Sequence, residues 1–526
     1  MSNYESFVLD IFPMSVEEKL TALAFQGIVN RDGPNVFYRA RFWNWPDADD
    51  KWIEWFQERK GVKFTKVGTL PELVAEFSGK IKGCVVWDPR LDQTKWVACV
   101  LAGLEDLLPI APECIGRYGD LPIVEDLRGR WDKELDVVRW SIDNLIPRTN
   151  KEMMYSVEFC WSGRTIDSID YAVSQRAYIY SLRHGKRRAE EGDWQAEQRL
   201  AHEVHTLIGP MAAVFGWGEP EEDYCRHVTH HDNYIMCAEA PNLSFFAQIP
   251  CERTDWKQPA RKDPSQFKLE DKHYITFNTS EGDTPKMAVA LMGGSWFDPN
   301  RGKVPVCWGI NPIFLKFFPV LLEYYWDTAT ENDYFMGGAS GAGYVYPNLL
   351  TRPMPYFKQV REYFGKADMH DTDAWMHFNE PVYDKYAEVA GLESISMPCG
   401  PFGVTLVNRG QTCVFMRGNS GLNYFDASAS AEDLANAIRA HCEKRGKPSF
   451  STIHIVPDAG HPAAQGGYCP SDFLNIQEML GPDYKITTMQ EMAVLAKEAI
   501  NTGKLLDARD PRYNEWEDVR KKTEKK

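Results

Sequence analysis

Short apolar runs that alternate with helical segments constrain the fold of this chain more than any other feature. Near the amino end, an apolar run over 7–12 precedes a Ser-x-x-Glu capping box formed by Ser15 and Glu18, and further strand-like runs follow at 35–38 and 83–87. Later runs recur at 273–277, 304–308, 334–336, 403–407, 413–416, 453–456 and 485–487. Helical segments lie between several of them, so the pattern predicts an α/β protein with either a barrel or a doubly wound sheet.

The chain has 526 residues, which corresponds to about three or four domains at roughly 150 residues each. A polar segment at 253–264 carries two prolines and no apolar period, which is typical of a linker. We therefore expect small amino-terminal α/β domains over 1–68 and 69–118, a helix-rich α/β domain over 119–265, a barrel-like catalytic domain over 266–510 and a charged tail over 511–526.

Composition excludes several classes of protein. The 59 Lys and Arg against 75 Asp and Glu give a net charge of −16, which repels phosphate backbones, so we expect no nucleic-acid partner. No apolar stretch approaches the roughly 18 residues of a membrane span, so we expect no membrane partner. The first residues lack the pattern of a secretory signal, and the 12 cysteines are scattered without a Cys-x-x-Cys pair. We expect a cytoplasmic protein with reduced thiols.

Acidic residues follow the run at 273–277 directly. Glu281 and Asp283 flank Gly282, and such a pair could share a proton, hold a cation or bind sugar hydroxyls. An Asx-type turn that caps the next helix is the alternative.

A second group of candidates follows on connecting segments. Trp296, Asp298, Arg301 and Trp308 could form a ring-stacking platform with polar groups beside it, and we predict that they bind substrate. Core packing explains the two tryptophans equally well.

The most specific segment of the chain is rich in glycine and tyrosine. Glycines at 338, 341 and 343 allow positive φ and close approach to a ligand, while Ser340 and Tyr344 could present hydroxyl groups to it. A purely structural glycine turn is the alternative.

This segment carries a resemblance to a known family. Residues 341–347 spell Gly-x-Gly-Tyr-x-Tyr-Pro, and the chain resembles the GxGYxYP family of glycoside hydrolases. Segments 23–31, 83–89, 216–217 and 241–244 are similar to the amino-terminal segments of that family, and 270–500 is similar to its barrel-like carboxy-terminal domain. The resemblance implies catalytic roles for Asp283, for Asp333 at the end of a strand-like run before the glycine motif, and for His454 at the end of a late strand. A helix cap or turn residue is the alternative for Asp333, and a buried structural histidine is the alternative for His454. The family usually has Ser-Asp-Gly-Asp-Asn after this strand, whereas residues 280–284 here are Ser-Glu-Gly-Asp-Thr. Asp283 therefore matches the second acid of the family motif, and Glu281 stands in place of the first.

A histidine-rich segment offers a second candidate for the functional site. Three imidazoles and a carboxylate lie within 227–232, where substrate contact, metal binding and an ordinary polar loop are all open. The spacing matches no standard zinc signature, and His202 and His205 do not form His-Glu-x-x-His. We predict substrate contacts for His230 and His231 and assign no metal ligand. We expect no cofactor, while leaving a divalent metal open.

We therefore predict a glycan-active enzyme that draws two carboxylates from Glu281, Asp283, Asp298 and Asp333, with His454 as an acid or base. A small glycoside or an oligosaccharide is the expected substrate, and the oligomeric state is left open. A metal-dependent carbohydrate deacetylase or lyase, and a non-catalytic glycan-binding protein, are the alternatives.

Overall fold

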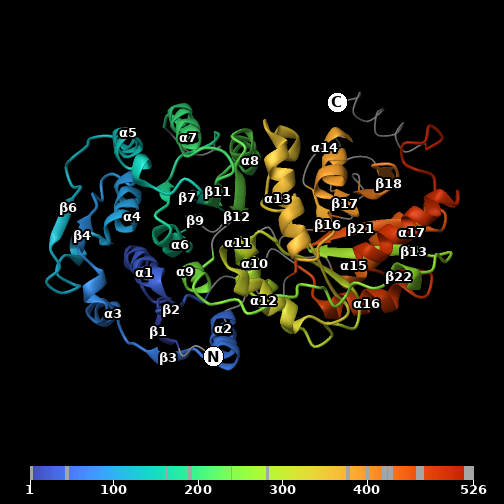
Figure 1. The fold of residues 1–526 in the computed structure, drawn as a ribbon, viewed down its shortest axis with the longest axis horizontal. Helices are drawn as coiled ribbons and strands as arrows, with labels where there is room; N and C mark the ends of the chain where they lie inside the picture. The colour runs from blue at the N-terminus through green and yellow to red at the C-terminus, as the bar shows by residue number, and fades with distance from the viewer. Residues whose placement is uncertain are drawn as a thin grey trace. The chain divides into compact units, whose positions relative to one another are not determined.

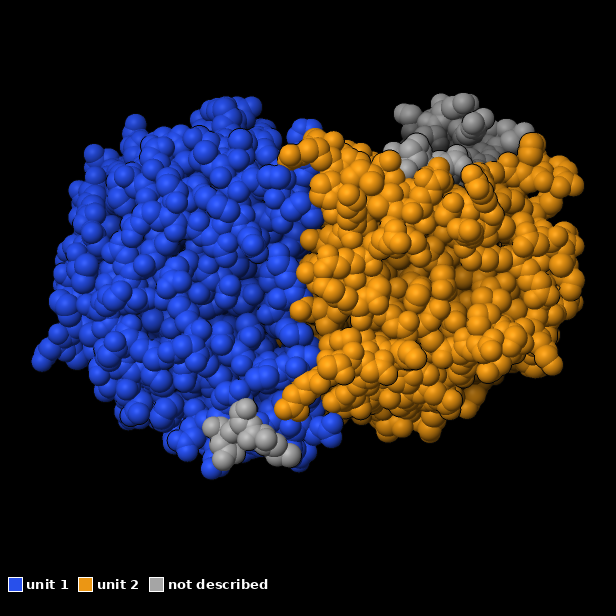
Figure 2. Space-filling model, in the orientation of Figure 1, with its two compact units in different colours: residues 1–251, 316–321 blue, residues 252–315, 322–526 orange. Residues whose placement is uncertain are grey.

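The computed structural model divides the chain into two compact units, shown in different colours in Figure 2. Unit 1 contains residues 1–251 and 316–321, and unit 2 contains residues 252–315 and 322–526. The structure describes residues 4–41, 47–157, 159–160, 163–164, 166–186, 192–237, 240–279, 284–374, 380–397, 402–417, 423–424, 430–457 and 467–513. The five-part division expected from the sequence stays a prediction.

Unit 1 is built on parallel sheets, as the alternating pattern predicts. Its three main sheets have the strand orders β2-β1-β3, β5-β4-β6 and β10-β7-β11-β12. The strands are β1 (Glu5–Asp10), β2 (Val36–Arg39), β3 (Lys63–Lys66), β4 (Gly83–Val86), β5 (Leu107–Ile110), β6 (Ile123–Asp126), β7 (Met153–Val157), β10 (Tyr178–Tyr180), β11 (Ala213–Trp217) and β12 (Tyr234–Cys237), with a short antiparallel pair β8 (Phe159–Cys160) and β9 (Gly163–Arg164).

Helices connect the strands of unit 1 (Figure 1). They are α1 (Val16–Val29), α2 (Ala48–Lys60), α3 (Leu70–Glu76), α4 (Gln93–Glu105), α5 (Glu134–Asn144), α6 (Ile169–Ser174), α7 (Trp194–Ile208), α8 (Glu221–His230) and α9 (Leu243–Phe246). The predicted capping box of α1 is confirmed, because Ser15 accepts from the backbone N–H of Glu18 and the Glu18 side chain accepts from the backbone of Ser15.

Unit 2 contains two larger sheets. The first has the order β15-β14-β13-β21-β20 with β22 paired to β13, and all of its pairings are parallel. The second has the order β16-β17-β19-β18, in which only the β18–β19 pairing is antiparallel. The strands are β13 (His273–Thr279), β14 (Val306–Gly309), β15 (Asp333–Met336), β16 (Asp371–Asp373), β17 (Ser394–Met397), β18 (Phe402–Val407), β19 (Thr412–Arg417), β20 (Asn423–Tyr424), β21 (Ser449–Ile455) and β22 (Tyr484–Ile486).

The helices between these strands are α10 (Pro285–Val289), α11 (Phe314–Phe317), α12 (Pro319–Thr328), α13 (Pro353–Lys366), α14 (Glu380–Lys385), α15 (Ala431–Cys442), α16 (Pro470–Leu480) and α17 (Met489–Asn501). The mixed α/β class with parallel sheets in more than one folding unit is therefore confirmed.

Residues of the two sheets of unit 2 contact each other. An isolated parallel bridge joins Gly337 to Thr372, and the hydroxyl groups of Ser396 and Thr452 lie 3.0 Å apart. Among the strands that the structure describes, no pairing closes the sheets into a barrel, so barrel closure stays a prediction.

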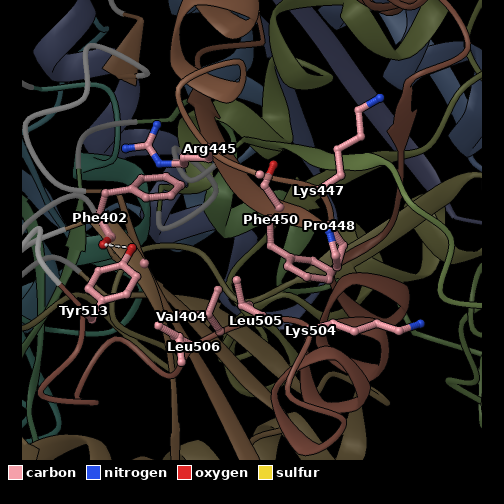
Figure 3. A pocket seen from close by; sticks show the side chains of 13 residues that line it. Phe402, Val404, Arg445, Lys447, Pro448, Phe450, Lys504, Leu505, Leu506 and Tyr513 are labelled. Carbon is pink, nitrogen blue, oxygen red and sulfur yellow. Dashed lines mark hydrogen bonds between the residues drawn. The ribbon is translucent and has the colours of Figure 1, made fainter.

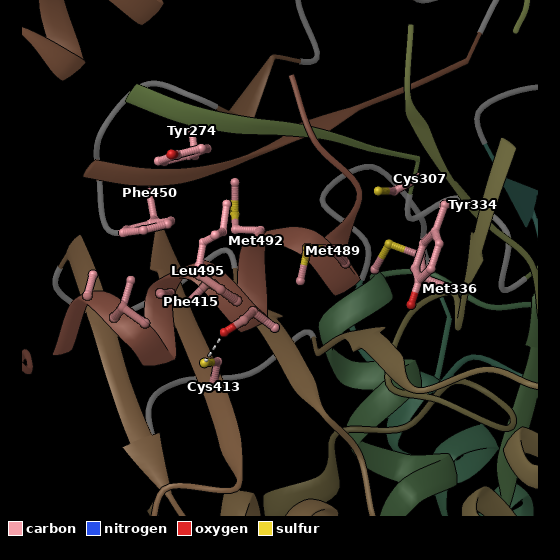
Figure 4. Close-up of a cluster of buried hydrophobic side chains, with 14 of the residues drawn as sticks. Tyr274, Cys307, Tyr334, Met336, Cys413, Phe415, Phe450, Met489, Met492 and Leu495 are labelled. Atoms are coloured by element: carbon pink, nitrogen blue, oxygen red, sulfur yellow. Dashed lines mark hydrogen bonds between the residues drawn. The ribbon is translucent and has the colours of Figure 1, made fainter. Parts of the chain in front are cut away.

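Helix α17 supplies much of the core of unit 2. Its residues Met489, Met492 and Leu495 recur at helical spacing and are fully buried. They belong to one hydrophobic cluster with Tyr274 of β13 and Phe450 of β21, whose rings stack with centroids 5.2 Å apart (Figure 4). This packing holds β13 and β21 together, the two strands that carry part of the candidate site.

Within the described ranges, no helix is both long enough and apolar enough to cross a membrane.

Candidate functional site

A buried carboxylate and a buried imidazole meet at the carboxyl ends of parallel strands in unit 2. Asp373 is the last residue of β16, and His454 is the next-to-last residue of β21. The His454 Nδ1 atom lies 3.7 Å from Asp373 Oδ2, and both side chains are fully buried. Such a pair can hold or transfer a proton. The sequence pointed to His454, whereas Asp373 was missed; its only local signal is an acidic residue that ends a short strand.

The glycine-rich loop lies against the backbone of Asp373. The backbone N–H of Ser340 donates to the Asp373 carbonyl oxygen over 2.6 Å. Gly341 has φ 122°, and a Cβ atom there would lie 3.1 Å from a methyl group of Val360. The positive φ therefore favours glycine at this position, and the Ser340–Asp373 hydrogen bond places the loop beside Asp373.

The predicted binding hydroxyls of this loop are buried. Ser340 donates its hydroxyl proton to the carbonyl oxygen of Val345 over 2.6 Å, which supports the loop itself. Tyr344 is also buried, with its ring centroid 6.0 Å from that of Tyr346. Substrate binding by Ser340 and Tyr344 stays a prediction.

Two buried asparagines near the carboxyl ends of these strands each have a side-chain amide atom without a hydrogen-bond partner among the described residues. Asn278 of β13 is paired in register with His454, and its Oδ1 has no hydrogen-bond partner among the described residues. Asn311, just after β14, accepts from the backbone N–H of Gly343 over 3.2 Å, while its own Nδ2 has no partner in the described part of the chain. Unpaired buried amide atoms are costly, so they are typical of sites that contact a ligand or water. Sequence reasoning missed both residues.

Asp333 corrects one expectation. It was predicted to lie at the end of a strand, but it is the first residue of β15 and therefore lies at the opposite, amino-terminal edge of the sheet. Its carboxylate forms an ion pair with Arg301 and accepts hydrogen bonds from Trp308 Nε1 and from the backbone N–H of Thr330, each over 2.8 Å. Every described contact of this carboxylate supports the fold.

The aromatic candidates belong to the same network. The Arg301 guanidinium lies 4.1 Å from the centroid of Trp296, whose ring packs edge-on against Trp308 with centroids 5.2 Å apart. Both tryptophans are buried. The structure thus brings Trp296, Arg301, Trp308 and Asp333 together as internal packing, and it gives the tryptophans no exposed face for a sugar ring.

Asp298 is half-buried and stabilises a turn. It accepts from the hydroxyl of Ser471 and from the backbone N–H of Asn300, each over 2.8 Å. Glu281 and Asp283 lie outside the described residues.

A second buried acid begins β16. Asp371 accepts hydrogen bonds from the hydroxyl groups of Tyr334 and Ser394. Burial raises the pKa of Asp371, and the negative charge of Glu393 raises it further. The carboxyl group of Asp371 therefore accepts hydrogen bonds from two protein hydroxyls.

The predicted contacts His230 and His231 lie in unit 1, at the end of α8. His230 is exposed, and the half-buried His231 accepts or donates a hydrogen bond to His202 of α7, with 2.8 Å between their ring nitrogens. They belong to a histidine cluster that also contains His184, His205 and His227.

A cavity of about 290 Å³ lies elsewhere in unit 2, at the amino-terminal end of β21 (Figure 3). Its lining includes Phe402, Arg445, Lys447, Lys504 and Tyr513. The described lining contains no carboxylate and no imidazole, so it holds none of the predicted catalytic residues.

Three family models match the chain. Residues 6–79 and 81–149 match the first and second domains named GxGYxYP_N, and residues 271–454 match the "GxGYxYP putative glycoside hydrolase C-terminal domain". No curated protein matches the chain.

A solved structure shares the fold. A "putative hydrolase" from Bacteroides thetaiotaomicron VPI-5482 is 17% identical, covers 94% of this chain and 95% of its own, and has a TM-score of 0.77. A "putative polysaccharide deacetylase" from Mycobacterium smegmatis is 11% identical, covers 46% of this chain and 95% of its own, and has a TM-score of 0.32.

Proposed function

Because the chain belongs to the GxGYxYP family, we propose that it is a carbohydrate-active hydrolase that cleaves a glycosidic bond, with Asp373 and His454 in its active site. The observation that carries this proposal is the buried carboxylate–imidazole pair at the carboxyl ends of parallel strands. Binding groups gather at this edge in parallel α/β folds, because loops vary there while the sheet holds them in place.

Glycoside hydrolysis needs one carboxylic acid that protonates the leaving oxygen and a second carboxylate that acts as base or nucleophile. We assign Asp373 as one member of this pair, and His454 as the group that shares or relays its proton. We propose that Glu281 or Asp283 supplies the second carboxylate, because both follow β13 in the sequence and β13 pairs with β21. The buried amide atoms of Asn278 and Asn311 are suited to bind sugar hydroxyls.

The test is release of the aglycone from a panel of small aryl glycosides. We expect Asp373→Asn and His454→Gln each to lower kcat by about 100-fold or more, because each removes an acid–base group. Loss of turnover in Glu281→Gln or Asp283→Asn identifies the second carboxylate.

Asp371→Asn is the matched control, since Asp371 is a buried acid on the same strand whose oxygens already accept from protein hydroxyls. It should lower the melting temperature while turnover persists. Full turnover in both Asp373→Asn and His454→Gln contradicts the assignment. Sugar binding by the wild type without turnover favours a glycan-binding protein, and chelator-sensitive acetyl release favours a deacetylase.

A further inference from the structure

Histidine side chains from two helices of unit 1 meet in one cluster. From their placement we propose that His202, His227 and His231 bind a divalent transition-metal ion such as Zn²⁺. This inference is independent of the hydrolase proposed for unit 2, because it uses none of the residues of that site.

The two helices present their histidines at helical spacing. Helix α7 carries His202, while α8 carries His227 and is capped at its carboxyl end by His231, four residues later. The ring centroid of His227 lies 4.2 Å from that of His202 and 5.1 Å from that of His231, and the latter two centroids are 5.0 Å apart. One ligand nitrogen from each ring lies within 4.8 Å of the other two. With Zn–N bonds of about 2.0–2.1 Å, small side-chain rotations bring all three onto one ion.

His227 lies at the centre of the cluster with nothing to bind. Its side chain is only 5% exposed, yet neither of its ring nitrogens has a hydrogen-bond partner among the described residues. A buried imidazole without partners is unfavourable, and a metal ion would satisfy one nitrogen directly.

The adjacent buried set of His184, His205 and His227 fits a metal less well. The backbone N–H of Ala212 donates to Asn233 Oδ1 over 2.9 Å, so Asn233 Nδ2 is the atom that donates to His205 Nδ1 over 3.1 Å. His205 Nε2 therefore carries its proton and faces the hydroxyl of Tyr180 at 2.9 Å. Both nitrogens of His205 are already used.

In the contacts described, the ring nitrogens of His202 and His231 form no hydrogen bond to groups other than each other. Their ring nitrogens point at each other over 2.8 Å, so one shared proton would leave when a metal replaces it. His202 is exposed and His231 is half-buried, which gives an ion a path from solvent and leaves coordination positions for water.

The donor atoms of the proposed site are all imidazole nitrogens. An all-imidazole set selects Zn²⁺, Cu²⁺, Ni²⁺ or Co²⁺ over Mg²⁺ and Ca²⁺.

The test uses the full chain, freed of metal by a chelator, and titrated with Zn²⁺ by calorimetry and with Co²⁺ by visible absorption. We expect one equivalent to bind, with Co²⁺ d–d bands of nitrogen coordination. His202→Gln and His231→Gln should each weaken binding by about tenfold or more, since each removes a ligand. Both residues are at least partly exposed, so these variants should fold, which far-UV circular dichroism checks.

His230→Gln is the matched control, because His230 is an exposed neighbour on α8 that belongs to neither set of three. It should bind Zn²⁺ like the wild type, as should His184→Gln. Absence of Zn²⁺ and Co²⁺ binding by the wild type overturns the proposal. Unchanged binding in His202→Gln and His231→Gln with loss in His184→Gln overturns the choice of ligands.

Discussion

Three buried aspartates of unit 2 differ in what surrounds their carboxylates. Asp333 is neutralised by Arg301 and bonded to Trp308, and Asp371 is bonded to Tyr334 and Ser394. Asp373 instead faces the imidazole of His454, whose Nδ1 lies 3.7 Å from Asp373 Oδ2. At the scale of single residues, the partner of each acid therefore separates a structural carboxylate from a candidate catalytic one.

Asp333→Asn tests the structural assignment of this acid. The substitution leaves the guanidinium of Arg301, which is mostly buried at 15% side-chain exposure, without its counter-charge. We expect the free energy of unfolding to fall by about 3 kcal/mol, as for other broken buried ion pairs, while kcat stays near that of the wild type. Guanidinium-induced unfolding and glycoside turnover measure the two effects.

Glu362→Gln is the control for Asp333→Asn, because Glu362 forms an exposed ion pair with Lys366 on α13. We expect it to change the free energy of unfolding by less than about 1 kcal/mol. If Asp333→Asn keeps the stability of the wild type but loses turnover, Asp333 acts in the active site and the structural assignment is wrong.

At the scale of elements, close packing of helices depends on small residues at the points of contact. Gly27 of α1 lies against α6, where a Cβ atom would be 2.2 Å from the carbonyl oxygen of Asp170 and 2.9 Å from Val173. Helix propensity alone favours alanine at such a position. The tertiary contact therefore overrides the local preference.

We expect Gly27→Ala to lower the free energy of unfolding by about 1–3 kcal/mol, because the helices must separate to admit the methyl group. Gly365→Ala on α13 is the matched change, since a Cβ atom there meets nothing within 4 Å. It should raise stability by about 0.5–1 kcal/mol. Thermal unfolding compares the stability of the two variants. Equal effects of the same sign would show that the contact between α1 and α6 does not determine the effect of a methyl group at residue 27.

At the scale of the whole molecule, chain order and folding unit do not coincide. Residues 316–321 lie within the sequence of unit 2 but belong to unit 1. The fully buried ring of Phe318 packs there against Tyr171, with centroids 5.6 Å apart, and Phe317 packs against Phe215 at 5.7 Å. A distant segment of the chain thus completes the core of unit 1.

Phe318→Ala should therefore weaken unit 1 although residue 318 lies far along the chain. We expect a loss of about 3–5 kcal/mol, typical of a buried phenylalanine, seen as faster amide hydrogen exchange in α6 and β11. Phe297→Ala, at a phenylalanine that is 43% exposed, should change stability by less than about 0.5 kcal/mol. Faster exchange confined to unit 2 in Phe318→Ala would contradict the assignment of this segment.

Local patterns in the sequence determined the α/β class, the capping box at Ser15 and Glu18, and the family motif at 341–347. These features depend on periodicity and on neighbouring residues, which a single sequence displays directly. His454 was recognised for the same reason, since it lies within a clear apolar strand and matches a family position.

Only the tertiary structure decided which of these residues meet. The pairing of Asp373 with His454, the place of Asp333 at the amino-terminal edge of its sheet, and the convergence of histidines from α7 and α8 all depend on strand order, register and helix packing. A shift of one residue in register reverses the face on which a strand's side chains lie. Such long-range placement is fixed by burial of the whole core, so no local segment of the sequence contains it.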